Sequence, residues 1–67
     1  MRYRDARLLK EGDEVVRKDD NATMILSEVQ VFGQYKKVKL VCYLKDDAQQ
    51  EKLYYYHDAL VGEEDEA

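Results

Sequence analysis

Few side chains in this sequence could carry out catalysis. His57 is the only histidine and precedes Asp58, whose carboxylate could orient the imidazole ring, and Cys42 is the only cysteine. Residues adjacent in sequence rarely meet in that way. Alternation along the segment around Cys42 turns its thiol toward the interior, where a thiol has little thiolate character. We therefore assign no catalytic residue and expect a protein that is not an enzyme.

Patterns for binding metals or phosphate are also missing. One histidine and one cysteine cannot supply the four ligands of a structural zinc site. The pairs Asp19, Asp20 and Asp46, Asp47 lack the spacing of a calcium loop and are typical of solvated turns. No glycine-rich phosphate loop is present, and the backbone of a turn explains Gly12. We expect neither a metal nor a cofactor.

Three consecutive tyrosines, Tyr54, Tyr55 and Tyr56, provide the strongest candidate for a binding surface. Alternation along a strand places the first and third on one face and the middle one on the other. We expect Tyr55 in the core, packed with Leu60. If the strand near 36–45 pairs with these tyrosines, the outward face joins them to further side chains of the same parity: Lys37, Lys39, Val41, Tyr43, Tyr54 and Tyr56.

This outward face allows three interpretations. Tyrosine offers rigid contact area with a polar tip, which suits docking of a protein segment. A tyrosine ring can also stack on the bases of single-stranded nucleic acid. Cross-strand aromatic pairs also stabilise a sheet without binding anything. The sequence leaves all three open.

The distribution of charge favours protein over nucleic acid as the partner. The net charge is -4, and the 15 acidic residues include Glu63, Glu64, Asp65 and Glu66. The remaining 11 acidic residues balance the 11 basic ones in 1–62. A nucleic-acid interface normally shows a basic excess, because basic side chains replace the counterions of the phosphates. We therefore expect another protein as the partner, with nucleic acid as the alternative.

We expect a single domain over residues 1–62, followed by a disordered acidic tail over residues 63–67. A lone cysteine permits no intrachain disulfide, which is typical of a reducing compartment. No apolar run approaches the roughly 20 residues that cross a bilayer, and the N-terminal segment lacks the apolar centre of a signal peptide. These features predict a cytoplasmic protein without a membrane partner. No pattern predicts the oligomeric state.

Apolar and aromatic segments alternate with turn-forming clusters, which predicts a meander of short strands. In the second strand the parity of the apolar residues changes, so we predict a bulge near Ser27 and Glu28 and a strongly bent strand, as a small barrel requires. A short helical turn is expected near 58–61, with Asp58 as N-cap and Gly62 as a left-handed stop. The expected strands lie near 14–18, 23–32, 36–45 and 51–56.

The chain has an apolar residue at Leu9, a Gly12-Asp13 turn, then Val15, Lys18 and Met24, followed by Leu26 and Val29, and further along Cys42, Tyr55 and Leu60. This spacing resembles the YodC-like family of small bacterial proteins over about residues 9–60. The resemblance implies an SH3-like or KOW-like barrel of four to five antiparallel strands, and no established activity. The chain departs from the family pattern at Asp20, Asn21 and Ala22, where the family has Gly-Gly-Pro, and at Leu44, where it has tryptophan.

Together these patterns lead to one preferred function and two alternatives. The preferred hypothesis is a non-enzymatic protein-binding or accessory module, of bacterial or phage origin, that uses the exposed tyrosines and lysines. The first alternative is a KOW-like nucleic-acid-binding protein that uses the same aromatic residues with Arg2, Arg4 and Arg7. The second is an acidic phage-type inhibitor that occupies the nucleic-acid channel of a host protein.

Overall fold

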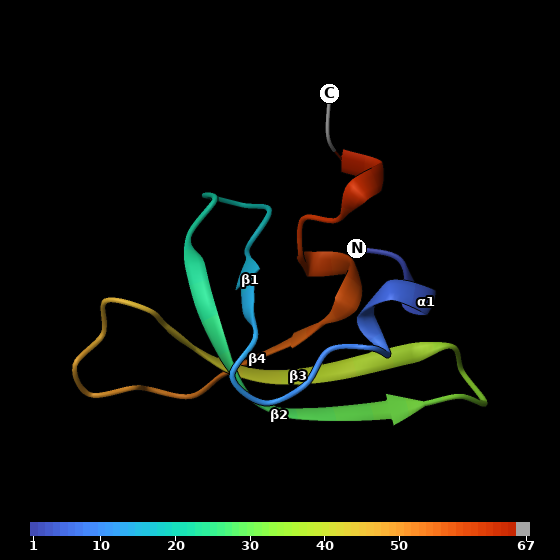
Figure 1. The fold of residues 1–67 in the computed structure, drawn as a ribbon, viewed down its shortest axis with the longest axis horizontal. Coiled ribbons are helices and arrows are strands. Elements are labelled where there is room, and N and C mark those ends of the chain that lie inside the picture. Colours follow the sequence, from blue (N-terminus) through green and yellow to red (C-terminus); the bar gives the residue numbers. More distant parts are fainter. Residues whose placement is uncertain (66–67) are drawn as a thin grey trace.

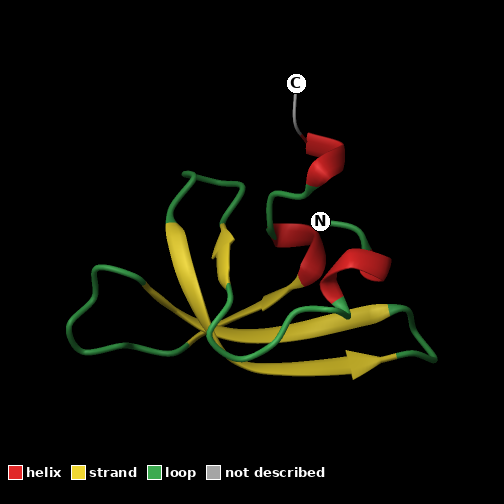
Figure 2. Ribbon diagram, in the orientation of Figure 1, coloured by secondary structure: helices red, strands yellow, loops and turns green. Residues whose placement is uncertain are grey.

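The structure is a computed structural model and describes residues 1–65. Its four strands form one antiparallel sheet in the order β1-β2-β3-β4, which confirms the expected mainly β class (Figures 1 and 2). The N-terminal segment forms a short helix. The elements are α1 (Tyr3–Ala6), β1 (Glu14–Val16), β2 (Thr23–Phe32), β3 (Lys37–Leu44), β4 (Leu53–Tyr56), and the 3-10 turns η1 (His57–Ala59) and η2 (Glu63–Asp65).

The strand β4 begins two residues later than the sequence suggests, because Asp47 organises the preceding loop. Its carboxylate accepts hydrogen bonds from the backbone N–H groups of Gln49 and Glu51, both at 3.0 Å. A short aspartate side chain that bonds nearby N–H groups favours turns over strands. The chain therefore enters β4 only at Leu53.

The predicted bulge is present in β2. Leu26 pairs with Cys42 and Glu28 pairs with Val41, so Ser27 is the extra residue. Its hydroxyl donates to the carbonyl oxygen of Val41 at 3.3 Å. The extra residue reverses the parity of the strand, so that apolar residues before and after it face the same side.

The core lies on one side of the sheet. It is covered by α1, which precedes the sheet in the sequence, and by η1, which follows it (Figure 1). Ala6 of α1 and Leu60, directly after η1, are both buried there. Tyr55 is only partly buried but packs against this core, as expected. The buried residues of the core are Ala6, Val15, Met24, Leu26, Val38, Leu40, Cys42 and Leu60.

The helical turn forms close to its expected place, but both of its predicted boundary signals are wrong. Tyr56 occupies the N-cap position and no side chain caps the turn, so Asp58 lies inside it. Gly62 lacks the left-handed conformation, which among the described glycines only Gly12 adopts, with φ 94°. A Cβ on Gly62 would lie 2.6 Å from Met1 Cα, so a close approach of two backbone segments explains this glycine.

The chain returns to the first strand after η1. Leu60 forms an isolated antiparallel bridge with Arg17, and the N–H of Val61 donates to the carbonyl of Val16 at 2.8 Å. The side of β1 that faces away from β2 is therefore occupied by the segment around Leu60. This return positions Leu60 in the core.

The acidic end of the described chain lies near its beginning. Glu63–Asp65 form η2, and the Glu64 carboxylate lies 2.9 Å from the N-terminal ammonium group and 3.8 Å from Arg2 Nε. Residues 66–67 of the expected tail lie outside the described residues. The division of the chain at residue 62 and the role of the tail stay predictions. Within residues 1–65, no helix has the length and apolarity to cross a bilayer.

Candidate functional site

The register of β3 and β4 brings the predicted binding residues together. Lys39 pairs with Tyr56 and Val41 pairs with Tyr54, so alternate residues of the two strands share the side opposite the core. We call this surface the tyrosine-lysine face. It consists of Lys37, Lys39, Val41, Tyr43, Tyr54 and Tyr56.

Two lysines of this face lie over two of its tyrosine rings. Lys37 Nζ is 5.2 Å from the ring centroid of Tyr56, and Lys39 Nζ is 5.7 Å from that of Tyr54. Both distances are within the range in which an ammonium group is attracted to an aromatic ring. Tyr54 is 62% exposed and Tyr56 is 48% exposed. The face therefore presents large aromatic area with positive charge already placed beside it.

Val41 does not belong to the accessible part of this face, contrary to expectation. It is buried, although it points away from the core cluster. Tyr54 lies across from it on β4, and the bulge residue Ser27 lies on its other side, on β2. Tyr43 is half-buried. Val41 therefore contributes buried packing and no accessible surface. Tyr54 and Tyr56 supply most of the exposed aromatic area of the tyrosine-lysine face.

A hollow of about 300 Å³ adjoins the tyrosine-lysine face at the end of the β2-β3 hairpin. Phe32, Tyr35, Lys37 and Tyr56 line it. The sequence analysis did not identify Phe32 and Tyr35 as site residues. Phe32 is the last residue of the strand expected near 23–32, and Tyr35 lies in the connection to the next strand. The predicted bulge could have identified Phe32 as a residue of this surface. After the bulge the parity of β2 is reversed, so Phe32 faces the outward side, across from Lys37.

The hairpin that carries these residues is strongly basic in an otherwise acidic chain. Residues 29–45 contain four lysines and no aspartate or glutamate, so all 15 acidic residues lie elsewhere. The near-neutral balance of residues 1–62 therefore hides a local excess of positive charge. The lysines are Lys36, Lys37, Lys39 and Lys45, and because Lys45 forms an ion pair with Glu14 at 2.8 Å, the first three make up the excess.

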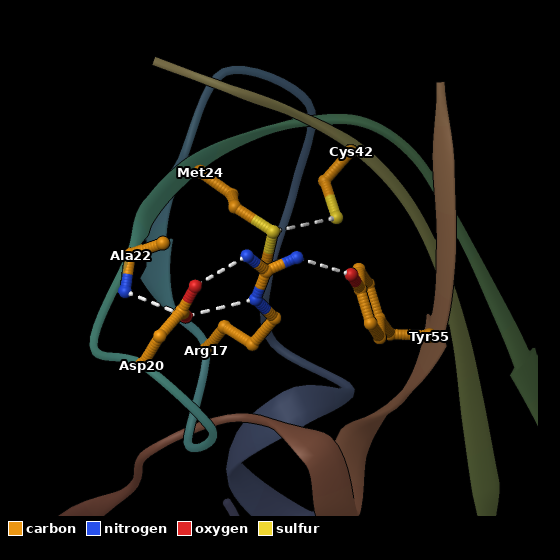
Figure 3. Close-up of polar contacts among 6 residues, drawn as sticks. All are labelled: Arg17, Asp20, Ala22, Met24, Cys42 and Tyr55. Atoms are coloured by element: carbon orange, nitrogen blue, oxygen red, sulfur yellow. Dashed lines mark hydrogen bonds and ion pairs between the residues drawn. The ribbon is translucent and has the colours of Figure 1, made fainter. Parts of the chain in front are cut away.

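A polar cluster on the opposite side of the sheet joins Arg17, the residue after β1, to β4 (Figure 3). Arg17 donates from Nη1 to Tyr55 Oη at 2.6 Å, and from Nε and Nη2 to the Asp20 carboxylate at 2.9 Å and 2.6 Å. The N–H of Ala22 donates to the same carboxylate at 3.1 Å. The hydrogen bond from Arg17, with that from Ala22, lowers the pKa of Asp20 to about 2. Sequence reasoning treated Asp20 only as a solvated turn residue.

Cys42 and His57 have structural contacts where they lie. Cys42 Sγ is 3.7 Å from Met24 Sδ, and burial raises the pKa of its thiol. His57 Nδ1 accepts a hydrogen bond from the Val38 N–H at 3.3 Å, and its ring meets Tyr3 edge-to-face at 6.2 Å. Among the side chains that the structure describes, no three His, Cys, Asp or Glu residues gather as metal ligands would.

Comparisons with known proteins add no family to this geometry. No protein-family model, curated protein or solved structure matches the chain. The resemblance to the YodC-like family therefore stays a prediction, and the function has to be argued from the tyrosine-lysine face and the basic hairpin.

Proposed function

We propose that this protein is a non-enzymatic binding module that docks an acidic segment of another protein on its tyrosine-lysine face. The observation that carries the proposal is the placement of Lys37 and Lys39 beside the exposed rings of Tyr56 and Tyr54. Aromatic side chains of this kind supply most of the binding energy in many protein interfaces. Lysines at their border select a partner of opposite charge.

We further propose that the scaffold is a small SH3-like barrel. Four consecutive antiparallel strands are followed by a 3-10 turn, and the chain then returns to β1 through the bridge between Leu60 and Arg17. The bulge at Ser27 supports this proposal, because it bends β2. In such a scaffold the tyrosine-lysine face lies outside, while Leu60 fills one end of the interior.

Two features make this face suited to an acidic protein segment. The tyrosine rings have few rotatable bonds, so ordering them on binding costs little conformational entropy. The lysine side chains already lie along the rings, which reduces the freedom that they lose when a carboxylate binds. An acidic segment can therefore contact ring edges and ammonium groups together.

Nucleic acid is the second candidate, and the basic hairpin over residues 29–45 favours it. The exposed rings of Tyr35, Tyr54 and Tyr56 could stack on bases. Two of these rings, however, already have a lysine ammonium group over one face, where a base would have to stack. The net charge of -4 also opposes binding of a polyanion at long range. We therefore rank an acidic protein segment first.

Fluorescence anisotropy with two labelled probes tests this function. One probe is a peptide of alternating glutamate and valine, and the other is a mixed-sequence single-stranded oligonucleotide. We expect the peptide to bind the wild-type protein, and Tyr54→Ala to weaken binding by about tenfold or more, as for a central aromatic anchor. Lys39→Gln should also weaken it, because the charge beside Tyr54 is lost.

Matched controls come from exposed residues away from the face. Leu8→Ala removes an exposed apolar side chain next to α1, and Lys10→Gln removes a lysine outside the basic hairpin. Both variants should bind the peptide like the wild type. Binding of the oligonucleotide alone, with a steep loss on adding salt and in Tyr54→Ala, would replace this function by the second candidate.

A further inference from the structure

The sheet has one edge that no described segment covers. The outer side of β1 is paired with the segment around Leu60, whereas β4 is the last strand in the sheet order. Within residues 1–65, Leu53–Tyr56 make backbone hydrogen bonds only to β3. The backbone groups of β4 that face away from β3 are thus available to another chain.

Of the features that usually prevent an edge strand from pairing with other chains, β4 has a short length, at four residues. Proteins also protect edge strands with proline, with charged residues or with a bulge. The chain contains no proline, the residues of β4 are one leucine and three tyrosines, and the only register shift lies in β2. A short edge of this kind is suited to binding an extended segment through its backbone.

We propose that the acidic partner segment binds as an added strand along the free edge of β4. This inference rests on the proposed function and specifies how the partner is recognised. A strand added there lies about 4.8 Å from β4, and its alternate side chains point to opposite sides of the sheet. One set lies beside Tyr54 and Tyr56, whose rings carry the ammonium groups of Lys39 and Lys37. Carboxylates are favoured at these positions.

The other set of partner side chains lies on the side of Leu53 and Tyr55, which pack against the apolar core and where the Tyr55 hydroxyl is already bonded to Arg17. Uncharged β-branched side chains fit this side and favour the extended conformation. The partner is therefore a segment in which acidic and apolar residues alternate. The hollow lined by Phe32, Tyr35, Lys37 and Tyr56 adjoins the last residue of β4 on the outward side, so a residue of the acidic set lies nearest to it, and Lys37 in its lining favours a carboxylate there.

Charge argues against a second copy of this chain as the occupant. Pairing of two β4 strands would place Lys37 and Lys39 of both copies on one shared face, where like charges repel. The net charge of -4 on each copy adds repulsion at long range. A foreign acidic strand gains from the same lysines that disfavour self-association.

Two N-methylated peptides test the added strand. The parent probe is acetyl-Glu-Val-Glu-Val-Glu-Val-Glu-amide, and the analogues carry N-methyl groups either on all valines or on the internal glutamates. Successive residues of a strand direct their N–H groups to opposite edges. We expect one analogue to lose affinity by about tenfold or more, because its hydrogen bonds to β4 are removed, and the other to bind like the parent.

Hydrogen exchange measured by NMR gives a second readout that does not depend on peptide chemistry. Adding the parent peptide should slow the exchange of alternate amides in Leu53–Tyr56 by about tenfold or more, since these amides acquire hydrogen-bond partners. Amides at the far edge, in Glu14–Val16, should not change. A peptide of the same composition without the alternation serves as the control and should protect these amides much less.

The outcomes separate this inference from the proposed function. If the parent peptide does not bind, both are wrong. A second outcome is that the parent peptide binds and Tyr54→Ala weakens its binding, while both N-methylated analogues bind equally and the amides of β4 stay unprotected. In that case the proposed function stands and the added strand is wrong. If β4 amides become protected with rising protein concentration alone, and sedimentation shows a dimer, the edge belongs to a second copy and the inference is also wrong.

Discussion

Arg17 and Tyr55 are joined by a hydrogen bond of 2.6 Å between the guanidinium group and the phenol oxygen, across 38 positions of the sequence. The guanidinium carbon also lies 5.8 Å from the centroid of the same ring. Tyr55 is the middle residue of the three consecutive tyrosines. Because side chains alternate along β4, holding Tyr55 on the core side keeps Tyr54 and Tyr56 on the tyrosine-lysine face.

Replacing Tyr55 by phenylalanine should lower the melting temperature. The substitution keeps the ring but removes the oxygen that accepts the hydrogen bond from Arg17, in a site that is partly buried. We expect a decrease of about 4–8 °C, followed by circular dichroism. Tyr35→Phe removes a hydroxyl from a side chain that is 70% exposed, and should leave the melting temperature unchanged. Equal effects of the two substitutions would contradict a role for the Arg17 contact.

The carboxylate of Asp20 should make stability depend on pH in a defined window. Its pKa is lowered from 3.8 to about 2 in the folded chain, so the unfolded chain binds more protons between these values. The stabilisation from the charged form is therefore complete above the unfolded pKa and is lost as the pH falls through the folded one. Asp20→Asn should be less stable than the wild type near pH 7, and the difference should shrink toward pH 2.

Thermal melts of wild type and Asp20→Asn at several pH values measure this difference. Asp19→Asn is the control, because this exposed neighbour has no hydrogen bond to Arg17. It should show no comparable pH dependence relative to the wild type. A wild-type advantage over Asp20→Asn that persists at pH 2 would show that the charge on the carboxylate is not responsible.

Leu40 and Val31 should differ strongly in their contribution to stability, although both point to the core side. Leu40 is completely buried, and Leu40→Ala should lower the free energy of unfolding by about 2–5 kcal/mol. Val31 is 47% exposed near the end of the hairpin, and Val31→Ala should cost less than about 1 kcal/mol. Urea unfolding followed by circular dichroism compares the two. Similar losses would be inconsistent with the position of the core.

The thiol of Cys42 should react only when the protein unfolds. It is fully buried, and burial raises its pKa, so little reactive thiolate is present near neutral pH. With a stability of about 5 kcal/mol, labelling by an aromatic disulfide reagent should be about 10³-fold slower or more than in the denatured chain. Fast labelling of the folded protein would indicate local opening between β2 and β3.

The parts of the fold that follow from alternation could be predicted from the sequence. Val38, Leu40 and Cys42 alternate with outward residues in β3 and are buried, as this alternation predicts. The change of parity between Leu26 and Val29 revealed the bulge, because only an extra residue brings both halves of β2 to the core. Hydrophobic periodicity is a strong signal where one face of a sheet is buried.

The parts that depend on contacts between distant segments could not be predicted. The burial of Val41 results from Tyr54 on one side and the bulge on the other, which no local pattern reports. Gly62 was interpreted as a turn residue, but its role is the close approach of the Met1 backbone. The hydrogen bond between Arg17 and Tyr55 forms only because the fold brings the end of β1 close to β4. No local pattern in the sequence could therefore identify Tyr55 as the partner of Arg17.

The bulge at Ser27 decides which side of the sheet each later residue of β2 faces. If Ser27 were kept but paired in simple alternation, Glu28, Gln30 and Phe32 would turn inward and Val29 outward, whereas deletion of Ser27 itself would leave their present facing and remove only the bulge. Loss of the bulge with Ser27 in place would put a carboxylate in the core and remove an aromatic wall from the binding hollow together. A residue added to or removed from the loop between β3 and β4, by contrast, changes the register of no strand, although at Ala48 it would disturb the hydrogen bonds from Gln49 and Glu51 to Asp47. Variation in length among related chains should therefore concentrate in that loop and, within β2, be confined to the position of Ser27.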